Sequence, residues 1–492
     1  MVEETDPERE ARLDALADEH LQPVRREYVV EVTSSCSSCE PPLKRSKGRN
    51  RNRPREESPF ERGTPAAAED ERNKIPLETL QELQRKRYAF ETARGAQPVE
   101  ETGVDPLFLR PRKLVDFGDK VYVAPLTTVG NLPFRRVLVD LGADITCGEM
   151  AVAQNLIEGQ PSEWALLRRH ASEKVFGVQI AAAHADQMGQ CCELIRRYCD
   201  VDFVDVNCGC PIDPICRRGC GASLMRKRAK LRGVVETALR TVACAVTVKM
   251  RTGWTDDTPS AHTLVGLAQS WQHRGRGVEA VFVHGRSRTQ RYSRLADWSA
   301  INRVATCQDE AAALIPVIGN GDILSHQDWE AKRAEAPRVE SCAMLARGAL
   351  IKPWLPTEIK ERRTWDISAS ERLDILKSYV KYGLDHWGAD ACGVQRTRRF
   401  LLEWLSFLHR YTPAGLLERL PQRIHDRPPS FVGRSDLETL FASPLAVDWI
   451  KITEMLLGPV PDGFRFEPKH KANGYGTTGP PVAGADNNND WG

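Results

Sequence analysis

The sequence lacks long hydrophobic runs. Nowhere do 18 or more apolar residues follow one another, which excludes a membrane-spanning helix, because such a helix needs about 20. Residues 1–19 are acidic and contain no apolar stretch, so they do not form a secretory signal. The fourteen cysteines of a chain without an export signal are expected to be reduced thiols. We therefore expect a soluble, intracellular protein.

Charge and length set only broad limits. A net charge of +2 over 492 residues does not indicate a class of partner, and a chain of this length is expected to form about two to four domains. No G-x-G-x-x-G motif follows the first apolar run of the region that looks folded. Its absence argues against a dinucleotide-binding domain of the Rossmann type.

The first 105 residues have little periodic apolar pattern. Residues 44–55 form a basic, low-complexity run, and we predict a disordered tail for residues 1–105. The basic run fits a solvated linker, a nuclear-import signal or an arm for nucleic acid. Within this region residues 77–90 have the spacing of a short helix. Cys36 and Cys39 form a lone Cys-x2-Cys without two further ligands nearby, so we predict no zinc site.

Short apolar runs alternate with helix-like stretches from residue 120 onward. There are eight such runs, at residues 121–124, 144–147, 176–180, 203–206, 245–249, 280–284, 316–319 and 342–345. Apolar strands that alternate with helices indicate a parallel sheet covered on both faces. Eight units within about 230 residues fit a (β/α)8 barrel better than a doubly wound sheet. We therefore predict an α/β fold with a TIM barrel over residues 115–365.

The alternation ends after Pro353. Helical spacing continues in residues 370–388, 394–409, 414–421 and 435–456. We predict that residues 366–465 form a separate all-α helical domain. Residues 466–492 are rich in Gly, Asn and Pro and are predicted to be a disordered C-terminal tail.

Residues 203–212 (FVDVNCGCPI) combine a predicted strand with a forced turn. The first four residues are apolar except for Asp205, and a glycine and a proline then end the strand. The amide of Asn207 and the thiols of Cys208 and Cys210 lie at that turn. Such side chains at the end of a strand are typical of a functional loop rather than a packing element.

Polar residues and glycines recur at the carboxyl ends of the predicted strands, where TIM barrels place their chemistry. Residues 319–322 (GNGD) and 346–348 (ARG) combine glycines, which let backbone N–H groups approach an oxyanion, with an arginine. Lys249 and His284 could reach the rest of a phosphorylated cofactor, and the Gln179 amide could pair with a planar heterocycle. Together these residues indicate an FMN site, with a sugar-phosphate substrate site as the alternative.

The motifs at these strand ends resemble those of one enzyme family. Residues 124–135 (APLTTVGNLPFR) and 205–211 (DVNCGCP) are very close to the opening and catalytic motifs of tRNA-dihydrouridine synthases. The segments that resemble the branch acting on position 47 are 145–150 (ITCGEM), 161–170 (PSEWALLRRH), 393–411 and 468–473 (PKHKAN). The resemblance covers essentially the whole region predicted to be folded.

The resemblance implies a reaction, cofactors and site residues. Members of the family reduce a uracil in tRNA to 5,6-dihydrouracil: reduced FMN gives hydride to C6, a cysteine gives a proton to C5, and NADPH (or NADH) reduces the flavin. Cys210 matches the proton donor, and the matches to uracil-recognising residues are Asn207, Arg251 and Tyr292. The matches to FMN-binding residues are Pro125, Leu126, Thr127, Gln179, Lys249, His284, Asn320, Gly321, Asp322, Ala346 and Arg347. A proton donor needs a protonated thiol, so we expect that Cys210 is not strongly acidified.

The resemblance also implies partners. The family's helical domain binds tRNA, and the basic residues that fit such a role are Arg396, Arg398, Arg399 and Arg410, with Lys352 and residues 360–363 near the barrel rim. We expect a monomer that binds tRNA, with mRNA as a further candidate substrate, in the cytoplasm and nucleus. Members of this branch often carry zinc fingers before the barrel, and this sequence contains no such motif.

Other functions stay open from the sequence. A non-catalytic RNA-binding protein could keep the barrel as a scaffold, but the set Cys210, Lys249, His284 and Arg347 argues against it. A flavin reductase acting on a free pyrimidine, similar to dihydroorotate dehydrogenase, would not need the arginine-rich helical domain. The thiols between residues 191 and 220 could form an iron–sulfur or zinc cluster, but their spacing matches no common ligand pattern.

Overall fold

The computed structural model describes residues 70–91, 114–416 and 431–469. The basic run at 44–55 and the pair Cys36 and Cys39 lie outside these residues. The described chain divides into two compact units: a barrel unit, residues 71–366 with 410–416, and a helical unit, residues 367–409 with 431–469. Within these ranges, no helix combines the length and the apolar character that a membrane crossing requires.

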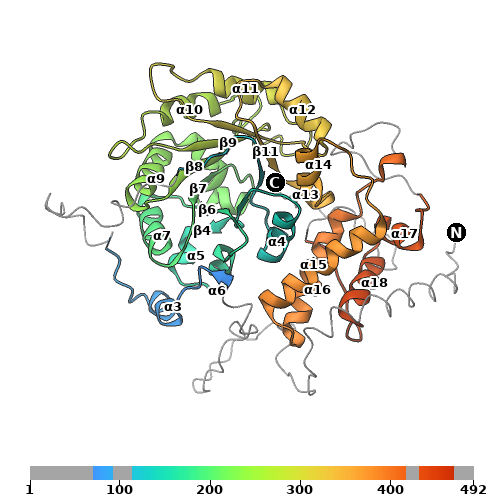
Figure 1. The fold of residues 1–492 in the computed structure, drawn as a ribbon. Coiled ribbons are helices and arrows are strands. Elements are labelled where there is room, and N and C mark those ends of the chain that lie inside the picture. Colours follow the sequence, from blue (N-terminus) through green and yellow to red (C-terminus); the bar gives the residue numbers. More distant parts are fainter. Residues whose placement is uncertain (1–69, 92–113, 417–430, 470–492) are drawn as a thin grey trace, which may run out of the picture. The chain divides into compact units, whose positions relative to one another are not determined.

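Eight parallel strands form the TIM barrel that the sequence predicts (Figure 1). They pair in chain order, and the pairings of β3 with β6 and of β11 with β2 complete the circle. The strands are β2 (Lys120–Val123), β3 (Ile145–Cys147), β6 (Val175–Ala181), β7 (Phe203–Cys208), β8 (Ala245–Arg251), β9 (Ala280–His284), β10 (Val317–Asn320) and β11 (Cys342–Leu345). Each of the eight predicted runs coincides with one of these strands to within one or two residues.

Helices connect the strands and cover the outside of the barrel (Figure 1). They are α4 (Leu132–Asp140), α5 (Ala153–Ile157), α6 (Pro161–Trp164), α7 (Ala185–Tyr198), α8 (Asp213–Arg217), α9 (Arg228–Thr241), α10 (Ala261–Ala268), α11 (Trp298–Thr306), α12 (His326–Glu335), α13 (Arg347–Ile351) and α14 (Leu355–Glu361), with the 3-10 helices η3 (Ala165–Leu167), η4 (Gly221–Arg226) and η5 (Ala414–Leu416). The β3–β6 connection also holds β4 (Ala151–Val152), which pairs with β6, and β5 (Arg169–His170). The longer helices pack through an apolar stripe; α7, for example, buries Met188, Cys191, Cys192 and Ile195 at helical spacing.

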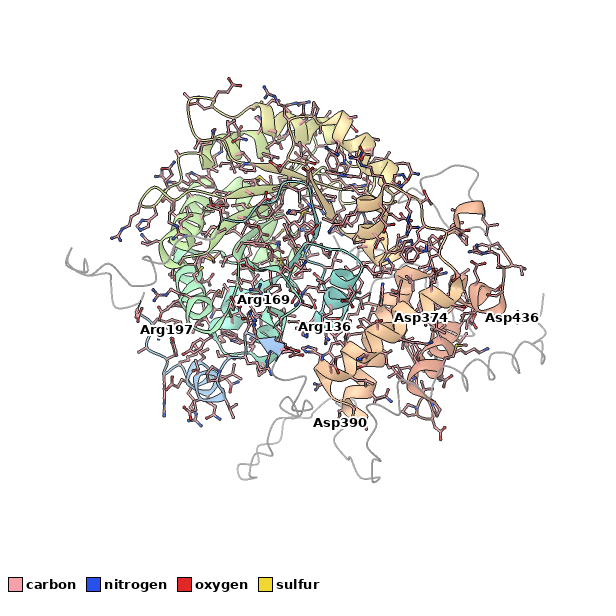
Figure 2. All side chains as sticks on the ribbon, in the orientation of Figure 1. Arg136, Arg169, Arg197, Asp374, Asp390 and Asp436 are labelled. Carbon is pink, nitrogen blue, oxygen red and sulfur yellow. The ribbon has the colours of Figure 1, made fainter. Side chains whose placement is uncertain are left out.

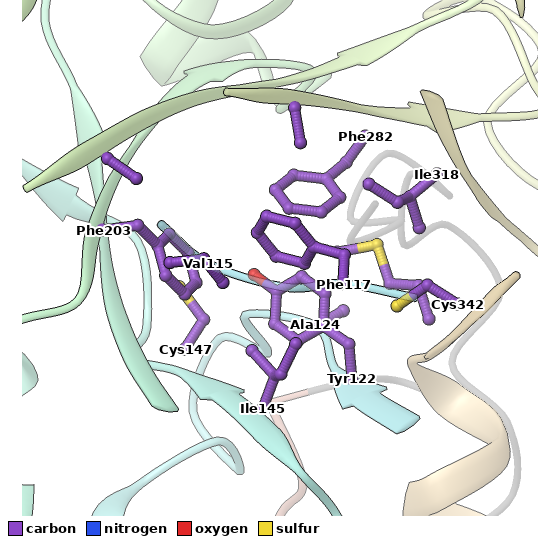
Figure 3. Close-up of a cluster of buried hydrophobic side chains, with 13 residues drawn as sticks. Val115, Phe117, Tyr122, Ala124, Ile145, Cys147, Phe203, Phe282, Ile318 and Cys342 are labelled. Atoms are coloured by element: carbon purple, nitrogen blue, oxygen red, sulfur yellow. The ribbon is translucent and has the colours of Figure 1, made fainter. Parts of the chain in front are cut away.

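Aromatic side chains fill the amino-terminal end of the barrel (Figure 3). Phe117, which precedes β2, lies edge-on to Phe203 and Phe282, with ring centroids 6.1 and 5.5 Å away. Tyr122 packs against the same two rings at 6.0 and 5.1 Å. Edge-to-face pairs of this kind are favourable beyond their buried area. Because this aromatic layer fills the amino-terminal end of the barrel, we expect a polar site at the carboxyl ends of the strands.

Part of the segment predicted as a tail is folded. Residues 71–91, the N-terminal strap, form β1 (Glu71–Arg72), which pairs antiparallel with β5, and α3 (Leu77–Gln84). The Asn73 amide donates to the Leu167 carbonyl, and Arg197 on α7 pairs with Glu91 (Figure 2). The prediction of disorder was therefore wrong for these residues, because the contacts that order them come from distant parts of the chain. The helix predicted for 77–90 is shorter, since Lys86 takes a left-handed conformation with φ 56°.

The helical unit contains α15 (Ala369–Trp387), α16 (Ala391–Leu408), α17 (Asp436–Ala442) and α18 (Ala446–Leu457). Side chains at their amino-terminal ends cap the long helices: Ser368 and Glu371 form a capping box on α15, and Asp390 accepts from the Gly393 N–H at the start of α16 (Figure 2). The single helix predicted over 435–456 is wrong. Ser443 is extended, with ψ 131°, because Pro444 follows it, and the helix divides there.

Candidate active site

The pairing register brings the predicted site residues to one end of the barrel. Asn207 is the strand partner of Lys249, and His284 pairs with both Arg251 on β8 and Asn320 on β10. Side chains alternate along a strand, so in β7 the interior positions are 203, 205 and 207. Phe203 lies in the aromatic core at the amino-terminal end of the barrel, and Asp205 and Asn207 follow toward the carboxyl end of the strand.

A row of hydrogen bonds crosses three strands beneath the predicted catalytic turn. Asp205 is fully buried, and its carboxylate accepts from the Gln179 amide at 2.7 Å and the Thr247 hydroxyl at 2.8 Å. The Gln179 oxygen accepts from the Asn207 amide nitrogen at 2.7 Å. The Asn207 oxygen in turn accepts from the Cys210 backbone N–H at 3.0 Å. Every polar group in this row therefore has a partner, as buried polar groups require.

Cys210 lies directly after β7, half-buried beside the basic residues of β8. Its carbonyl accepts from the Ala222 N–H at 3.0 Å, which holds the turn against η4. Burial raises the pKa of the thiol to about 11, and the nearby Arg251 and Lys249 offset this only in part. The thiol is therefore protonated at neutral pH, as a proton donor requires, and the expectation that Cys210 is not acidified agrees with this shift.

Basic side chains gather at the neighbouring strand ends. Burial lowers the pKa of Lys249 to about 8, and it also lowers the pKa values of Arg251 and Arg347. Arg286 is fully buried and forms two hydrogen bonds, at 2.8 and 2.7 Å, to the carboxylate of Asp322. Three arginines and a lysine, with the Asp322 carboxylate bound to Arg286, leave this end of the barrel suited to an anion such as a phosphate.

His284 is held in one tautomer. The Asn320 amide nitrogen donates to the Met344 carbonyl at 2.9 Å, which turns the Asn320 oxygen toward Nδ1 of His284 at 2.8 Å. His284 therefore carries its proton on Nδ1, and Nε2 faces Arg286 at 3.4 Å as an acceptor. Burial, with Arg251 close by, lowers the pKa of His284 well below 6.5. The ring is neutral and can hydrogen-bond a ligand without adding charge.

Tyr292 lies on the β9–α11 loop among the arginines of the site. Its ring centroid is 3.5 Å from the guanidinium carbon of Arg347, 5.4 Å from that of Arg286 and 5.8 Å from that of Arg251. Such cation–π contacts stabilise a half-buried aromatic ring among positive charges. The structure thus gathers Tyr292 and Arg251, two of the three predicted uracil-recognising residues, in one cluster.

The loop after β2 completes the rim. Pro125, Leu126 and Thr127 follow β2 directly, and β2 pairs with β11, so Ala346 and Arg347 emerge beside them. The Leu126 carbonyl accepts from the Gly130 N–H at 2.8 Å. A Cβ at Gly130 would stand 2.4 Å from that carbonyl oxygen, so this close turn requires glycine. Gly321, directly after β10, has a φ of 131°, a backbone conformation that also favours glycine.

Three residues of the site were given no role from the sequence. Asp205 anchors the row of amides, Arg286 binds Asp322, and Glu149 accepts from the Thr128 N–H at 2.6 Å and so fixes the loop after β2. A charged residue inside an apolar strand was a visible signal for Asp205. For Arg286 the signal was weaker, a basic residue two positions after His284. Asp322 itself uses its carboxylate on Arg286, so only its backbone is suited to bind a ligand.

The cysteines between 191 and 220 separate by environment. Cys191 and Cys192 belong to the packed face of α7, and Cys208 is buried on the opposite face of β7 from Asn207. Over the ranges that the structure covers, no group of three or more His, Cys, Asp or Glu side chains is arranged to hold a metal ion. Cys216 is only partly buried, and its thiol donates to the Cys210 carbonyl at 3.5 Å.

Two of the basic residues predicted to face RNA are buried. Arg398 donates to Thr453 at 3.0 Å and to the Gly458 carbonyl at 2.6 Å, so it caps the carboxyl end of α18. Lys352 forms an ion pair with Glu358 inside the barrel unit. The RNA-binding prediction is wrong for these two, because burial and a fixed partner remove their charge from the surface. Arg399 is exposed, as expected of a surface-binding residue.

The region that carries these motifs is similar to known proteins. Residues 122–403 match the family profile described as "Dihydrouridine synthase (Dus)". The chain is 55% identical over 389 residues to "tRNA-dihydrouridine(47) synthase [NAD(P)(+)]-like" of Rattus norvegicus, covering 78% of this chain and 59% of that protein. It is 52% identical over 372 residues to the Arabidopsis thaliana protein of the same name, covering 75% of this chain and 52% of that protein.

A fungal relative gives the same result. The chain is 47% identical over 393 residues to "tRNA-dihydrouridine(47) synthase [NAD(P)(+)]" of Coprinopsis cinerea, covering 78% of this chain and 57% of that protein. The chain thus spans between half and three fifths of the length of these relatives. The profile match includes every predicted site residue beyond the first strand, from Pro125 to Arg347. This chain belongs to the dihydrouridine synthase (Dus) family.

Proposed function

We propose that the protein reduces uridine to 5,6-dihydrouridine in tRNA, at position 47, with NADPH or NADH as the source of electrons. The names of the relatives support the reaction, the position and the nicotinamide. The observation that carries the proposal is the placement of Cys210 at a strand end beside a buried basic cluster, where burial raises the pKa of its thiol. A thiol with a raised pKa is a poor nucleophile and a suitable proton donor.

The residues at the strand ends fit FMN. Its phosphate needs cationic and N–H donors, which Arg347 and the turn at Gly321 offer at one place on the rim, with His284 on the neighbouring strand. Its ring system needs amide and basic partners, which Gln179 and Lys249 supply from β6 and β8. Further candidates are Pro125, Leu126, Thr127, Asn320, Asp322 and Ala346. Bound FMN would supply the hydride that reduces C6 of the uracil.

The protein's own part in the reaction is to hold the base and move one proton. Asn207 and Arg251 stand beside Cys210, and Arg251 is fixed by hydrogen bonds to the carbonyls of Gly209 at 3.0 Å and Ser287 at 2.8 Å. With Tyr292 they would orient a uracil turned out of the RNA stack. The Cys210 thiol would then give its proton to C5, and solvent would restore it after product leaves. Orientation in advance of binding is the main rate advantage that such groups provide.

The experiment that tests this proposal is complementation. Cells that lack the gene receive wild type, Cys210→Ala or Cys208→Ala, and dihydrouridine at position 47 is measured by mass spectrometry of tRNA fragments. We expect dihydrouridine with wild type and with the Cys208 variant, whose side chain is buried away from the site, and at least a 100-fold lower reduction rate with Cys210→Ala. Full dihydrouridine in cells without the gene, or with Cys210→Ala, would reject the proposal.

Two observations on purified protein separate the alternatives. The protein should be yellow and release FMN on denaturation, whereas a non-catalytic RNA-binding protein would release none. A reductase of free pyrimidines would oxidise NADPH or NADH with uracil or orotate as well as with tRNA. We expect turnover with tRNA alone, because the energy needed to unstack a base comes from contacts with the rest of the RNA.

We further propose that the protein acts as a monomer on tRNA, and on mRNA segments of similar shape, in the cytoplasm and nucleus. Exposed basic residues such as Arg399 and Arg362, the latter 72% exposed, support an RNA surface. Binding should weaken steeply between about 50 and 200 mM salt. Sedimentation tests the monomer, and fluorescent fusions with and without residues 44–55 test nuclear import.

A further inference from the structure

Asp205 is an unusual residue for the centre of a barrel. It is the one charged side chain of β7, it is fully buried, and burial raises its pKa to about 6. A buried carboxylate costs several kcal/mol unless it is well partnered, and an apolar residue of the same size would avoid that cost. Hydrogen bonds from Gln179 on β6 and Thr247 on β8 satisfy both of its oxygens. The cost suggests a purpose beyond packing.

The Asp205 carboxylate favours one orientation of the Gln179 and Asn207 side-chain amides. An ionised carboxylate only accepts hydrogen bonds, so Gln179 must turn its NH2 toward Asp205 and its oxygen away. That oxygen faces the NH2 of Asn207, whose own oxygen is then turned toward the backbone of the following turn. An amide has one donor end and one acceptor end of almost equal shape. The carboxylate at one end of the row and the backbone N–H groups of the turn at the other end therefore favour the same order.

The last member of the row contacts the catalytic turn itself. The Asn207 oxygen accepts from the N–H groups of Gly209 at 3.3 Å and Cys210 at 3.0 Å. If the amide were reversed, an NH2 would face two N–H donors and the turn would lose both hydrogen bonds. A proton donor displaced by about 1 Å can lose a factor of about 100 in rate.

We propose that Asp205 is a positioning residue: through Gln179 and Asn207 it sets the amide order that fixes the backbone of Cys210. Its hydrogen-bond partners are Gln179 and Thr247, so it acts on the turn through the two amides rather than by contact with the thiol. The inference rests on the proposed function for its effect on catalysis. The hydrogen-bond order itself is independent of that function, so it can be tested separately.

The variants follow from hydrogen-bond chemistry. Asp205→Leu keeps the approximate volume and removes the acceptor. Asp205→Asn keeps an acceptor oxygen for Gln179, and its NH2 can donate to the Thr247 hydroxyl, so the order of the row is preserved without the charge. Gln179→Met breaks the row while leaving Asp205 in place. Cys208→Ala, a buried change on the same strand, is the matched control for loss of packing.

The first measurement is amide hydrogen exchange of residues 207–212 in the holoenzyme, alongside melting temperature. We expect exchange at Gly209 and Cys210 to become at least 10-fold faster in Asp205→Leu and in Gln179→Met, and to stay near wild type in Asp205→Asn and Cys208→Ala. Unchanged exchange in both disrupting variants overturns the proposal. Equal loss of protection in Asp205→Asn and Asp205→Leu overturns it too, because charge rather than order would then matter.

The second measurement divides the catalytic cycle. Reduction of the bound flavin by NADPH does not use Cys210, whereas reduction of tRNA does. In Asp205→Leu we expect the tRNA step to fall about 100-fold at unchanged KM and the flavin step to fall much less, with partial recovery in Asp205→Asn. An equal fall in both steps indicates a general structural role and overturns the proposal. If wild type forms no dihydrouridine, the proposed function fails and the exchange data alone decide the role of Asp205.

Discussion

The thiol of Cys210 should be unusually slow to react with alkylating reagents. Burial raises its pKa to about 11, so at pH 8 only about one thiol in a thousand is ionised, compared with roughly one in four for a thiol of reference pKa 8.5. Because only the thiolate is alkylated, the rate at pH 8 should be lower by roughly 200-fold from ionisation alone. Between pH 7 and 10 the rate should rise about tenfold for each pH unit.

The assay is timed reaction with iodoacetamide, acid quenching and mass spectrometry of the Cys210 peptide, at intervals from pH 7 to 10. Cys307 is exposed and serves as an accessible thiol in the same molecule. Limited access of the reagent also slows the alkylation of Cys210. It lowers the rate equally at every pH, however, and does not change the pH at which the rate levels off. A Cys210 profile that levels off at or below pH 8 would refute the reasoning. In that case the thiol would act as a nucleophile more readily than as an acid.

Four further substitutions test the fold. Arg135 and Glu173 form a buried ion pair at 2.7 Å. Arg135→Met would leave the Glu173 carboxylate without its cationic partner and should lower the free energy of unfolding, measured by urea titration, by about 3–5 kcal/mol. Gly177→Ala should destabilise by at least about 1–3 kcal/mol, since a Cβ there would lie 2.1 Å from an aromatic ring. Gly233→Ala, whose nearest contact would be 3.7 Å away, should raise the melting temperature instead. Ser368→Ala removes the α15 capping box and should cost the helical unit about 1 kcal/mol, measured by circular dichroism.

The sequence was sufficient for the barrel because its pattern is local. Each strand is a short apolar run that ends in a polar or glycine residue, so both the strands and the site at their ends follow from reading the chain in order. Cys208 and Cys210 were also separable in principle, since alternation along β7 places the former away from the interior. The order of strands around the barrel then brings Gln179, Asn207 and Lys249 together without further information.

What the sequence could not show depends on partners far along the chain. Arg398 reads as one of several surface arginines until Thr453 and the end of α18, 55 to 60 residues later, enclose it. The direction of the Gln179 amide depends on Asp205, 26 residues later on the neighbouring strand, and that contact is not visible in the sequence around Gln179. The division of the helix at Pro444, by contrast, could have been predicted from the sequence, because the residue before a proline avoids helical conformation.

The N-terminal strap has a consequence for the order of folding. Its hydrogen-bond partners in the barrel unit lie between 75 and 128 residues further along the chain, from Gly159 to Asp200. Closing loops of this length is slow compared with forming neighbouring strand–helix units. During synthesis the strap therefore leaves the ribosome before the surface that receives it exists. The segment made before the barrel settles onto it only after β5 and α7 have formed, and until then Leu83, buried in the final structure, stays exposed to water.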